Sequence, residues 1–318
     1  MIRIHVILWL CSFFVWHLLF VSSFCALVFP YGPLSLFIHW ILWKLIWSLT
    51  ICSLFSASLT TPAEIPRNFV PPHDFVEKNS RRLLDAVAAW ARNQNLPVRF
   101  RRMATESGMT KAPNFCYICR LIKPDRAHHC RKCERCVLRM DHHCPVLGEC
   151  IHMHNHKFFM LFLLWASMLC LFAVLTVSPT VIFRMLALYR HSNLARMIPT
   201  ILVTSGTVNA LVCGIALLCF LRELTIALLR NETTLEGIAL HNYGERDAFD
   251  DGIAHFDLGS KFANFISIFG PDPYFWLLPL PSTYGSGCEF QYYIKYSTVA
   301  DEEQKACTQQ QNNGEGEE

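Results

Sequence analysis

Four long apolar runs alternate with polar sequence along the chain, at about residues 4–29, 34–59, 158–183 and 198–221. Each has about 20 residues or more, the length of helix that crosses a hydrocarbon core of roughly 30 Å. Because a water-free core requires every backbone polar group to be satisfied internally, each run is predicted to be a transmembrane helix. The predicted fold class is therefore an α-helical polytopic membrane protein with four transmembrane helices.

A secretory signal peptide is the alternative for the first run, since Arg3 precedes it. The run exceeds the usual apolar core of about 7 to 15 residues, and a second run follows directly after the turn at 30–33. A transmembrane helix is therefore favoured. In the second run, His39 and Lys44 must face a partner, water or the membrane interface.

The polar segment at 60–113 is expected to be a linker with one amphipathic helix, from about Val76 to Asn93. The apolar residues of this helix recur near helical spacing and are expected to pack against a cytosolic core; they are Leu83, Leu84, Val87, Ala88 and Trp90. A C-terminal region follows the fourth run at 222–299. The acidic tail at 300–318 has little apolar content and is predicted to be disordered.

Composition and charge agree with a membrane protein that carries a soluble part. Charged residues make up only 17% of the chain, against about 25% in soluble domains. Arg and Lys concentrate in 60–157, which favours the cytosolic side for this segment, and a solvated basic face explains many of them equally well. Four spans then place both termini in the cytosol and the loop at 184–197 on the far side. The expected location is a Golgi, endoplasmic reticulum or plasma membrane, with no nucleic-acid partner.

Seven of the 15 cysteines lie between Cys116 and Cys150, among histidines. A disulfide framework belongs to short secreted chains, so this cluster predicts metal binding in a reducing compartment. Two separate Cys-x2-Cys pairs with nearby histidines are typical of zinc sites, which take four tetrahedral ligands each. The segment at 114–157 is therefore predicted to be a small cytosolic zinc-binding domain with two zinc ions. Two sites need eight ligands, and the cluster offers seven cysteines and four histidines.

A thiol that is spared from zinc binding is a candidate nucleophile. Cys144 follows His142, which can take its proton, and Asp141, which can orient the imidazole. This is the nucleophile, base and orienter set of covalent catalysis, and it lies just before the third apolar run, within reach of a lipid thioester. The alternatives are a purely structural zinc module, in which Cys144 is another ligand, and a membrane-anchored zinc ubiquitin ligase.

The motif Asp141-His142-His143-Cys144, the stretch at 121–130 and Asn155-x3-Phe159 resemble the cysteine-rich domain of DHHC-type protein palmitoyltransferases. Further along, Thr233-Thr234-Leu235-Glu236 resembles the TTxE motif of that family. Asn264, followed by Ile268-Phe269-Gly270, is similar to its C-terminal motif. The resemblance therefore extends over most of the chain.

The resemblance implies two zinc sites that share no ligand. One site would use Cys116, Cys119, His129 and Cys136, and the other would use Cys130, Cys133, His143 and Cys150. The resemblance also implies that Cys144 takes a long-chain acyl group from palmitoyl-CoA and passes it to protein cysteines, while His142 handles the proton. The expected partners are the lipid bilayer, acyl-CoA, and cytosolic or membrane proteins with juxtamembrane cysteines.

Supporting roles follow from the same resemblance. Phe159 and Phe162 are expected at the mouth of an acyl-chain cavity among the spans, with ordinary helix packing as the alternative. The CoA phosphates are expected to bind three basic residues, unless these form only a solvated face; they are Lys123, Arg126 and His128. Thr234 is expected to hydrogen-bond Asp141 or to cap a helix, and Asn264 is expected to support the site from behind.

The chain departs from the family pattern after the nucleophile motif. It has Val146-Leu147-Gly148-Glu149 where Trp-Val-Asn-Asn is usual, and Ile151-His152 where Val-Gly is typical. Two further histidines, His154 and His156, are interpreted as surface residues. The absent Trp affects the expected acyl-chain contact, and the absent Asn pair affects the polar support near the second zinc. A weakly active or inactive relative that acts as a membrane zinc-binding adaptor is the alternative function.

Overall fold

The computed structural model describes residues 33–79, 82–105, 108–190, 194–239, 253–282 and 285–295. They form two compact units. The first, which we call the membrane unit, contains the described residues of 33–61, 144–226 and 269–282. The second, the zinc unit, contains the described residues of 62–143, 227–268 and 285–295. The predicted first transmembrane helix at 4–29 and the predicted disordered tail at 300–318 lie outside the described residues.

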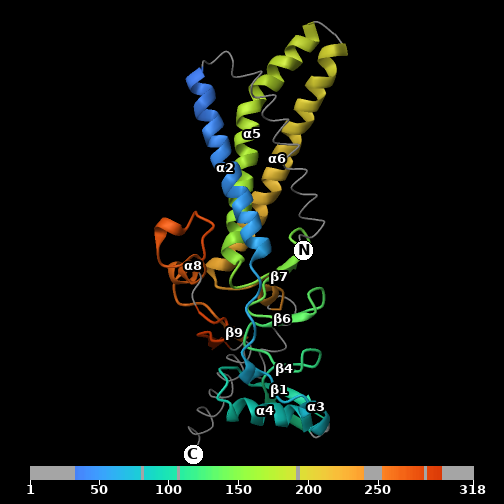
Figure 1. Cartoon of the computed structure of the whole chain (residues 1–318), viewed down its shortest axis with the longest axis vertical. Helices are drawn as coiled ribbons and strands as arrows, with labels where there is room; N and C mark the ends of the chain where they lie inside the picture. Colours follow the sequence, from blue (N-terminus) through green and yellow to red (C-terminus); the bar gives the residue numbers. More distant parts are fainter. Residues whose placement is uncertain are drawn as a thin grey trace, which may run out of the picture. The chain divides into compact units, whose positions relative to one another are not determined.

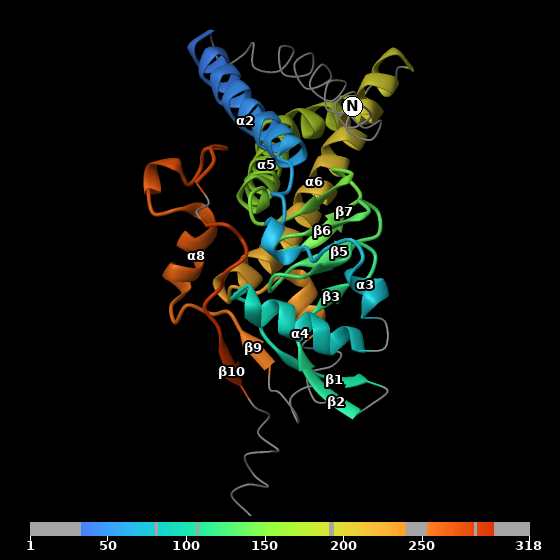
Figure 2. The same ribbon diagram turned by 60° about the horizontal axis from the view of Figure 1, so that its bottom comes forward.

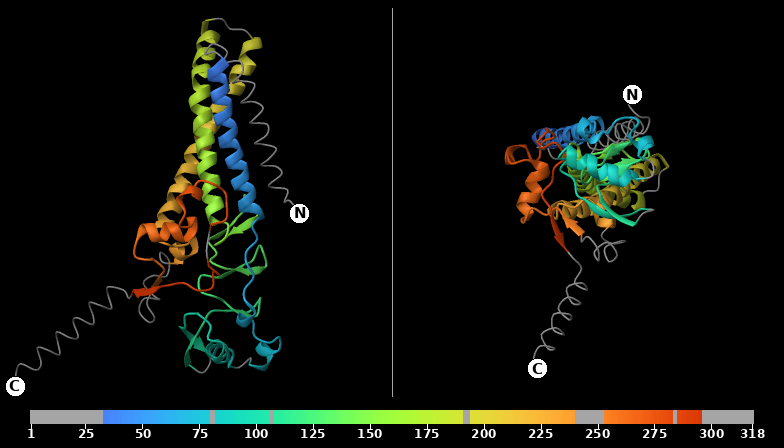
Figure 3. Two further views of the ribbon diagram at one scale, coloured as in Figure 1. Left: turned by 60° about the vertical axis from the view of Figure 1, so that its left-hand side comes forward. Right: turned by 90° about the horizontal axis from the view of Figure 1, so that it is seen from below.

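Three long helices make up most of the membrane unit: α2 (Pro33–Leu59), α5 (His156–Arg190) and α6 (Leu194–Leu229). Helices α2 and α5 run side by side (Figure 1; Figure 3, left), and Trp43 packs with Leu169 and Val177 between them. Within the described residues, these three helices are long and apolar enough to cross a membrane. Many of their apolar side chains are exposed, as contact with lipid requires. The unit has the structure of a multi-pass integral membrane protein.

Helices α5 and α6 extend well beyond the apolar runs that predicted them. The loop expected at 184–197 is mostly helical, because α5 continues to Arg190 and α6 begins at Leu194. The apolar runs mark only the part of a helix that needs to avoid water, and a helix can continue through polar sequence beyond it. The prediction of a loop was therefore wrong for residues 184–190 and 194–197.

A buried polar junction joins the end of α2 to the start of α5. The Asn155 side chain is fully buried; its Nδ2 donates to Ala57 O at 3.0 Å and to Cys150 O at 2.9 Å. Its Oδ1 accepts from His152 N at 2.7 Å, and His152 Nε2 lies 3.2 Å from Thr60 O. Both His152 and His156 are 1% exposed, so the interpretation of His156 as a surface histidine was wrong.

The N-terminal part of the zinc unit is a small helix-and-hairpin layer. Helix α4 (Leu83–Asn93) contacts the hairpin of β1 (Arg101–Thr105) and β2 (Gly108–Ala112), as Figure 2 shows. Its Val87 and Ala91 enter a core with Phe69, Phe115 and Ile122, so the predicted packing of this amphipathic face is confirmed.

The single helix predicted for Val76–Asn93 is two helices. A short α3 (Phe75–Lys78) precedes α4, and Asn79 ends it by donating from Nδ2 to Phe75 O at 2.8 Å. Asparagine competes with the backbone for hydrogen bonds in this way and so favours helix ends. The periodic pattern could not reveal the break because apolar residues continue on both sides of it.

The remaining elements are short. Three two-stranded sheets carry the cysteine-rich segment: β3 (Phe115–Cys116) with β4 (Leu121–Ile122), β5 (His128–Cys130) with β6 (Arg135–Val137), and β7 (His142–Cys144) with β8 (Glu149–Ile151). The C-terminal region contains β9 (Ile253–His255) paired with β10 (Tyr293–Lys295), α8 (Lys261–Phe269), and a 3-10 turn, η4 (Pro273–Phe275). Another 3-10 turn, η2 (Arg67–Phe69), follows α2.

Replacing Asn155 by alanine should destabilise the membrane unit. The change removes three hydrogen bonds and leaves buried carbonyl groups of Ala57 and Cys150 without this donor, at a cost of about 3 kcal/mol. The measurement is thermal unfolding of the purified protein in detergent. Asn209→Ala is the matched control, because Asn209 lies exposed on α6, where its side chain accepts a hydrogen bond from Cys213 Sγ. Equal melting temperatures for the two variants would contradict the role of Asn155.

Candidate active site and metal centres

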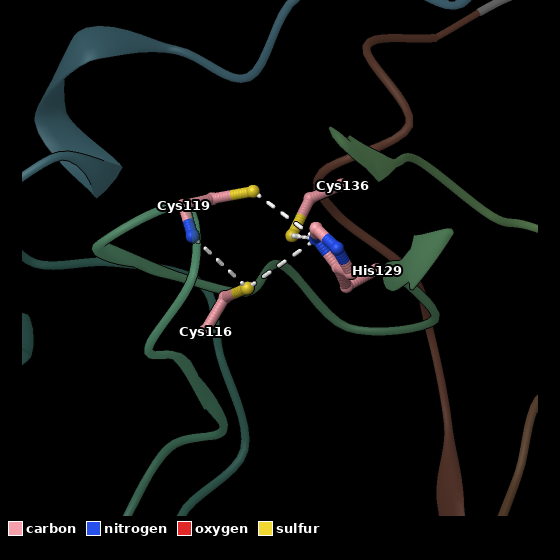
Figure 4. Close-up of side chains that lie close together, drawn as sticks. All are labelled: Cys116, Cys119, His129 and Cys136. Carbon is pink, nitrogen blue, oxygen red and sulfur yellow. Dashed lines mark hydrogen bonds between the residues drawn. The ribbon is translucent and has the colours of Figure 1, made fainter. Parts of the chain in front are cut away.

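The first metal-binding group consists of Cys116, Cys119, His129 and Cys136, whose ligand atoms all lie within 4.8 Å of one another. Figure 4 shows the three sulfurs and the imidazole converging on one point. His129 Nδ1 lies 3.7 Å from the sulfur of Cys116, 3.2 Å from that of Cys119 and 4.0 Å from that of Cys136. Tetrahedral zinc with its usual bond lengths separates a sulfur from a nitrogen ligand by about 3.6 Å, so the group fits a zinc ion.

The second group consists of Cys130, Cys133, His143 and Cys150, whose ligand atoms also lie within 4.8 Å of one another. His143 Nδ1 lies 3.5 Å from the sulfur of Cys130 and 3.4 Å from that of Cys133. These distances again suit tetrahedral zinc. The two groups are the two ligand sets that the family resemblance implied, and they fit two zinc sites.

Strand alternation explains why neighbouring residues serve different metal sites. In the β5–β6 hairpin, His129 is paired with Cys136, and both belong to the first group. Successive side chains on a strand point to opposite faces, so Cys130 leaves the strand on the other side and joins the second group. The hairpin therefore supplies ligands to both sites.

The two Cys-x2-Cys turns have the same geometry. The backbone N–H of Cys119 donates to the sulfur of Cys116 at 3.4 Å, and that of Cys133 donates to the sulfur of Cys130 at 3.4 Å. The next residues, Arg120 and Glu134, have φ angles of 53° and 55°. This left-handed conformation is unusual for residues with a side chain, and it turns the chain back after the second cysteine.

A buried carboxylate orients the histidine of the proposed catalytic pair. Asp141 is fully buried, and its Oδ2 lies 2.7 Å from His142 Nδ1. The hydroxyl of Thr234 donates to Oδ2 at 2.8 Å, and the backbone N–H of Thr234 donates to Oδ1 at 2.9 Å. The predicted bond between Thr234 and Asp141 is therefore present. Because a carboxylate accepts, His142 donates from Nδ1, which leaves Nε2 as the acceptor of the ring.

The Thr233–Glu236 motif is a helix cap as well as a support for Asp141. Thr233 Oγ1 accepts from Glu236 N at 3.2 Å, and Glu236 Oε2 accepts from Thr233 N at 2.9 Å. This reciprocal pair is a capping box, which begins a helical turn and leaves the next N–H, that of Thr234, pointing outward. The two interpretations of the motif are thus compatible, because Thr233 caps and Thr234 binds Asp141.

Arg126 binds within the protein. It is 5% exposed, and its Nε and Nη2 donate to Glu236 at 2.7 and 2.8 Å, while Nη1 and Nη2 donate to Asn231 at 3.1 and 2.7 Å. The guanidinium carbon also lies 4.3 Å from the ring centre of Phe256. With four hydrogen bonds to internal partners, Arg126 has little capacity left for the CoA phosphates that the sequence analysis assigned to it.

Burial alone would raise the pKa of the Glu236 carboxyl. Attraction to Arg126, with hydrogen bonds from that guanidinium and from Thr233 N–H, outweighs this effect and holds the pKa below its ordinary value of 4.5. The ion pair therefore persists at neutral pH, and its contribution to stability is lost as the pH falls through the lowered pKa.

The other two expected phosphate ligands differ from each other. Burial lowers the pKa of His128, and the nearby cations Lys123, Arg101 and Arg126 lower it further against the opposing effect of Glu236. A mostly neutral imidazole is a poor partner for phosphate at pH 7. Lys123 is half-buried and keeps its place as the candidate cation.

The sequence pattern did not indicate a role for two residues of this cluster, Arg139 and Asn231. Arg139 is 2% exposed and donates from Nη2 to Asn231 Oδ1 at 3.2 Å, the same oxygen that Arg126 contacts. Burial and the charge of Arg126 lower the pKa of Arg139 to about 9, although Glu236 and Asp141 oppose this. Charge balance is the sequence signal that could have pointed to Arg139, because a buried acidic residue such as Glu236 requires a cation somewhere in the fold.

Cys144 belongs to neither metal-binding group, and its side chain is buried. The turn after it closes with a hydrogen bond from Gly148 N to Cys144 O at 2.8 Å, and Gly148 has a φ of 65°. Glycine and asparagine both adopt this conformation readily, so glycine at the family's first Asn position carries no backbone penalty. At the second, Glu149 Oε1 accepts from Cys150 N at 3.1 Å and so provides a polar contact next to a zinc ligand.

The remaining predicted site residues lie in two places. Phe159 and Phe162 are buried in the first turns of α5, and the ring of Phe159 meets that of Phe220 edge-on at 6.0 Å. Asn264 is fully buried and bonds to Leu229 O, to Leu258 N and to the Asp257 carboxylate. Asn264 thus fastens α8 to the end of α6, and these three partners lie outside the proposed catalytic residues.

Comparisons with known proteins agree with this architecture. Residues 109–241 match the family model described as DHHC palmitoyltransferase. A palmitoyltransferase ZDHHC15 from Xenopus laevis is 31% identical over 296 residues, which are 89% of this chain and 78% of the relative. A palmitoyltransferase ZDHHC15A from Danio rerio is 41% identical over 199 residues, 62% of this chain and 56% of the relative. A probable protein S-acyltransferase 12 from Arabidopsis thaliana is 34% identical over 179 residues, 56% of this chain and 58% of the relative.

The membrane-spanning helices and the two Cys/His groups define a multi-pass membrane protein with a zinc-binding cysteine-rich domain. The chain belongs to the DHHC palmitoyltransferase family. It spans 56% of the zebrafish relative and 49% of a palmitoyltransferase ZDHHC20 from Mus musculus.

Replacing Cys136 by serine should lower the bound metal from two zinc ions per chain to about one, because a structural zinc site needs its fourth ligand. Elemental analysis of the purified protein measures this directly. Cys288→Ser is the control, since Cys288 is a buried cysteine outside both groups and should leave both ions in place. Two bound ions in Cys136→Ser would show that the first group does not hold zinc as described.

Replacing Glu236 by glutamine should destabilise the zinc unit by about 3 kcal/mol, because it leaves the buried Arg126 charge without its partner. Glutamine can still complete the capping box, so the change isolates the charge. Chemical denaturation at pH 7 measures the effect. The control Glu232→Gln removes a neighbouring carboxylate whose pKa burial already raises, and it should change the free energy of unfolding by less than about 1 kcal/mol. Equal effects would contradict the ion-pair argument.

Proposed function

We propose that this protein is a protein S-acyltransferase that moves a long-chain acyl group from acyl-CoA, through a thioester on Cys144, to cysteine residues of other proteins. The observation that carries the proposal is that the four residues of the DHHC motif have different partners. His143 belongs to a zinc group, Asp141 and His142 are hydrogen-bonded to each other, and Cys144 is a member of neither zinc group.

The local backbone supports a pairing of His142 with Cys144. Both residues lie on β7 with His143 between them. Alternate residues of a strand share a face. If His143 faces the second zinc group, His142 and Cys144 leave the strand on the other side, next to each other. Zinc at the second site would hold this strand in place. Its role there would be structural, because Cys130, Cys133, His143 and Cys150 would supply all four ligands of a tetrahedral ion.

In the first half-reaction, His142 Nε2 takes the proton of the Cys144 thiol, and the thiolate attacks the carbonyl carbon of the acyl-CoA thioester. The bond from that carbon to the CoA sulfur breaks, and the departing CoA thiolate receives the proton from His142. Asp141 holds the imidazole in the required tautomer and stabilises its protonated form, and Thr234 fixes Asp141.

The second half-reaction uses the same groups in the same order. His142 takes the proton of a substrate cysteine, whose sulfur attacks the acyl carbon on Cys144. The bond to Cys144 breaks, and the proton returns to the Cys144 sulfur. The products are an acylated protein cysteine and the starting enzyme, so no net proton, electron or water molecule is consumed.

The membrane unit would supply the site for the acyl chain. Phe159 and Phe162, buried at the start of α5, are the proposed contacts near its thioester end. Each buried methylene contributes about 0.8 kcal/mol, so the depth of the space among the spans would select the chain length. The donor that we propose is palmitoyl-CoA, with Lys123 as the cation for its phosphates.

The proposed setting is a membrane of the Golgi, the endoplasmic reticulum or the cell surface, with four spans and with both termini and the zinc unit in the cytosol. Acyl-CoA is a cytosolic donor, so a cytosolic zinc unit would place Cys144 on the side where the donor is found. The proposed substrates are cytosolic or membrane proteins whose cysteines lie next to the bilayer.

Replacing Cys144 by serine should abolish hydroxylamine-sensitive acyl incorporation into the purified protein incubated with labelled palmitoyl-CoA, while two zinc ions remain bound. A serine ester would resist hydroxylamine at neutral pH, so the treatment distinguishes the thioester. The matched control is Cys219→Ser, an exposed cysteine on α6 outside both zinc groups, which should keep the wild-type signal.

Two results would overturn this proposal. Persistent hydroxylamine-sensitive labelling of Cys144→Ser at the wild-type level would show that another cysteine carries the acyl group. Loss of one zinc ion from the same variant would show that Cys144 is a metal ligand, as the structural-module alternative requires.

A further inference from the structure

A stretch of exposed apolar residues follows α8 within the membrane unit. We call residues 273–281, with the sequence Pro-Tyr-Phe-Trp-Leu-Leu-Pro-Leu-Pro, the apolar segment. It contains no charged residue, and five of its large side chains are exposed: Tyr274 85%, Phe275 42%, Leu277 54%, Leu278 38% and Leu280 44%. On the surface of a soluble protein, this many adjacent exposed apolar side chains would indicate a contact with another protein or with a membrane.

Two side chains of α5 hold the apolar segment by its backbone. Lys157 is 1% exposed, and its Nζ donates to Phe275 O at 2.8 Å, to Leu280 O at 3.0 Å and to the Ser282 hydroxyl at 2.8 Å. Trp165 Nε1 donates to Leu277 O at 3.2 Å. All of these residues belong to the membrane unit, so the segment is fastened along one helix.

The position of these two anchors sets the depth of the segment. Lys157 and Trp165 are eight residues apart on α5, which corresponds to about 12 Å along a helix axis. Lys157 stands at the polar beginning of α5, and Trp165 lies well inside its apolar run. The backbone of Leu277 therefore lies beside a part of α5 that crosses the membrane.

The backbone of the apolar segment is unusually well satisfied for an irregular stretch. Three of its nine residues are prolines, which have no N–H to satisfy. The N–H groups of Tyr274, Phe275, Trp276, Leu278 and Leu280 all donate within the region from Asp272 to Leu278. The carbonyls of Phe275, Leu277 and Leu280 accept from Lys157 or Trp165. Irregular backbone at membrane depth is stable only when its polar groups have such partners.

We propose that the apolar segment is a lipid-embedded element of this protein, inserted from one surface into the boundary between lipid headgroups and acyl chains, in addition to the helices that span the bilayer. Its exposed side chains contact lipid, and Lys157 and Trp165 satisfy its inward-facing carbonyls. The inference rests on the membrane-spanning character of α5 and does not depend on acyl transfer.

Depth-dependent quenching by brominated lipids tests this proposal on the full-length protein in nanodiscs with one chain per disc. An environment-sensitive fluorescent amino acid replaces Leu277 in one variant and Met109 in the control. Met109 is 62% exposed on the β1–β2 hairpin of the zinc unit. Lipids brominated near the headgroup end of the acyl chain should remove most of the emission at position 277 and leave the emission at position 109 unchanged.

Either of two fluorescence results would contradict insertion of the apolar segment into lipid. Equal emission at position 277 in brominated and ordinary lipid would overturn the proposal and make the segment a solvated loop. If instead the emission shifts to the blue only in discs that hold two chains, a second copy covers the segment, which would also overturn it. A further variant, Lys157→Met, removes the three donated hydrogen bonds. It should reduce the quenching at position 277, because a segment with unsatisfied carbonyls moves toward water.

Discussion

The alternation of side chains along a short strand is the constraint on which the zinc unit depends. One hairpin, β5–β6, presents His129 and Cys136 to one metal-binding group and Cys130 to the other. Both metal-binding groups need ligands from this one hairpin, so the formation of one group helps to position the ligands of the other. The strands of this segment have only two or three residues each, so bound metal would add to the stability that buried residues such as Phe115, Ile122 and Leu138 provide. On β7, His143 belongs to a metal-binding group, whereas His142 and Cys144 on either side of it belong to neither group.

Glu236 connects this metal-ordered segment with the chain beyond the last span. It completes the capping box of Thr233, pairs with the buried Arg126, and through that turn presents Thr234 to Asp141. Glu236 thus helps to orient the Asp141 carboxylate through Thr234. The cluster of Arg126, Arg139 and Asn231 supplies the balance of charge and hydrogen bonds that lets an acidic residue lie there.

The sequence predicted those features that depend on residue type and spacing. Long apolar runs located α2, α5 and α6, and the Cys/His spacing together with the family resemblance gave both metal-binding groups. It failed where a residue's role depends on partners far along the chain. Arg126 looked like a surface cation for phosphate because Glu236, 110 residues away, cannot be recognised as its partner from spacing. His156 was interpreted as exposed because nothing in the local sequence indicates that the first turns of α5 are buried.

The junction between α2 and α5 has a consequence for hydration. The last carbonyls of a helix have no partner within that helix and normally bind water. At the end of α2, Ala57 O accepts from Asn155 and Thr60 O from His152, both of them buried. Protein groups thereby replace water at the place where the chain leaves the span. Because buried side chains donate to these two carbonyls, loss of water from this helix end on membrane insertion leaves neither carbonyl without a partner.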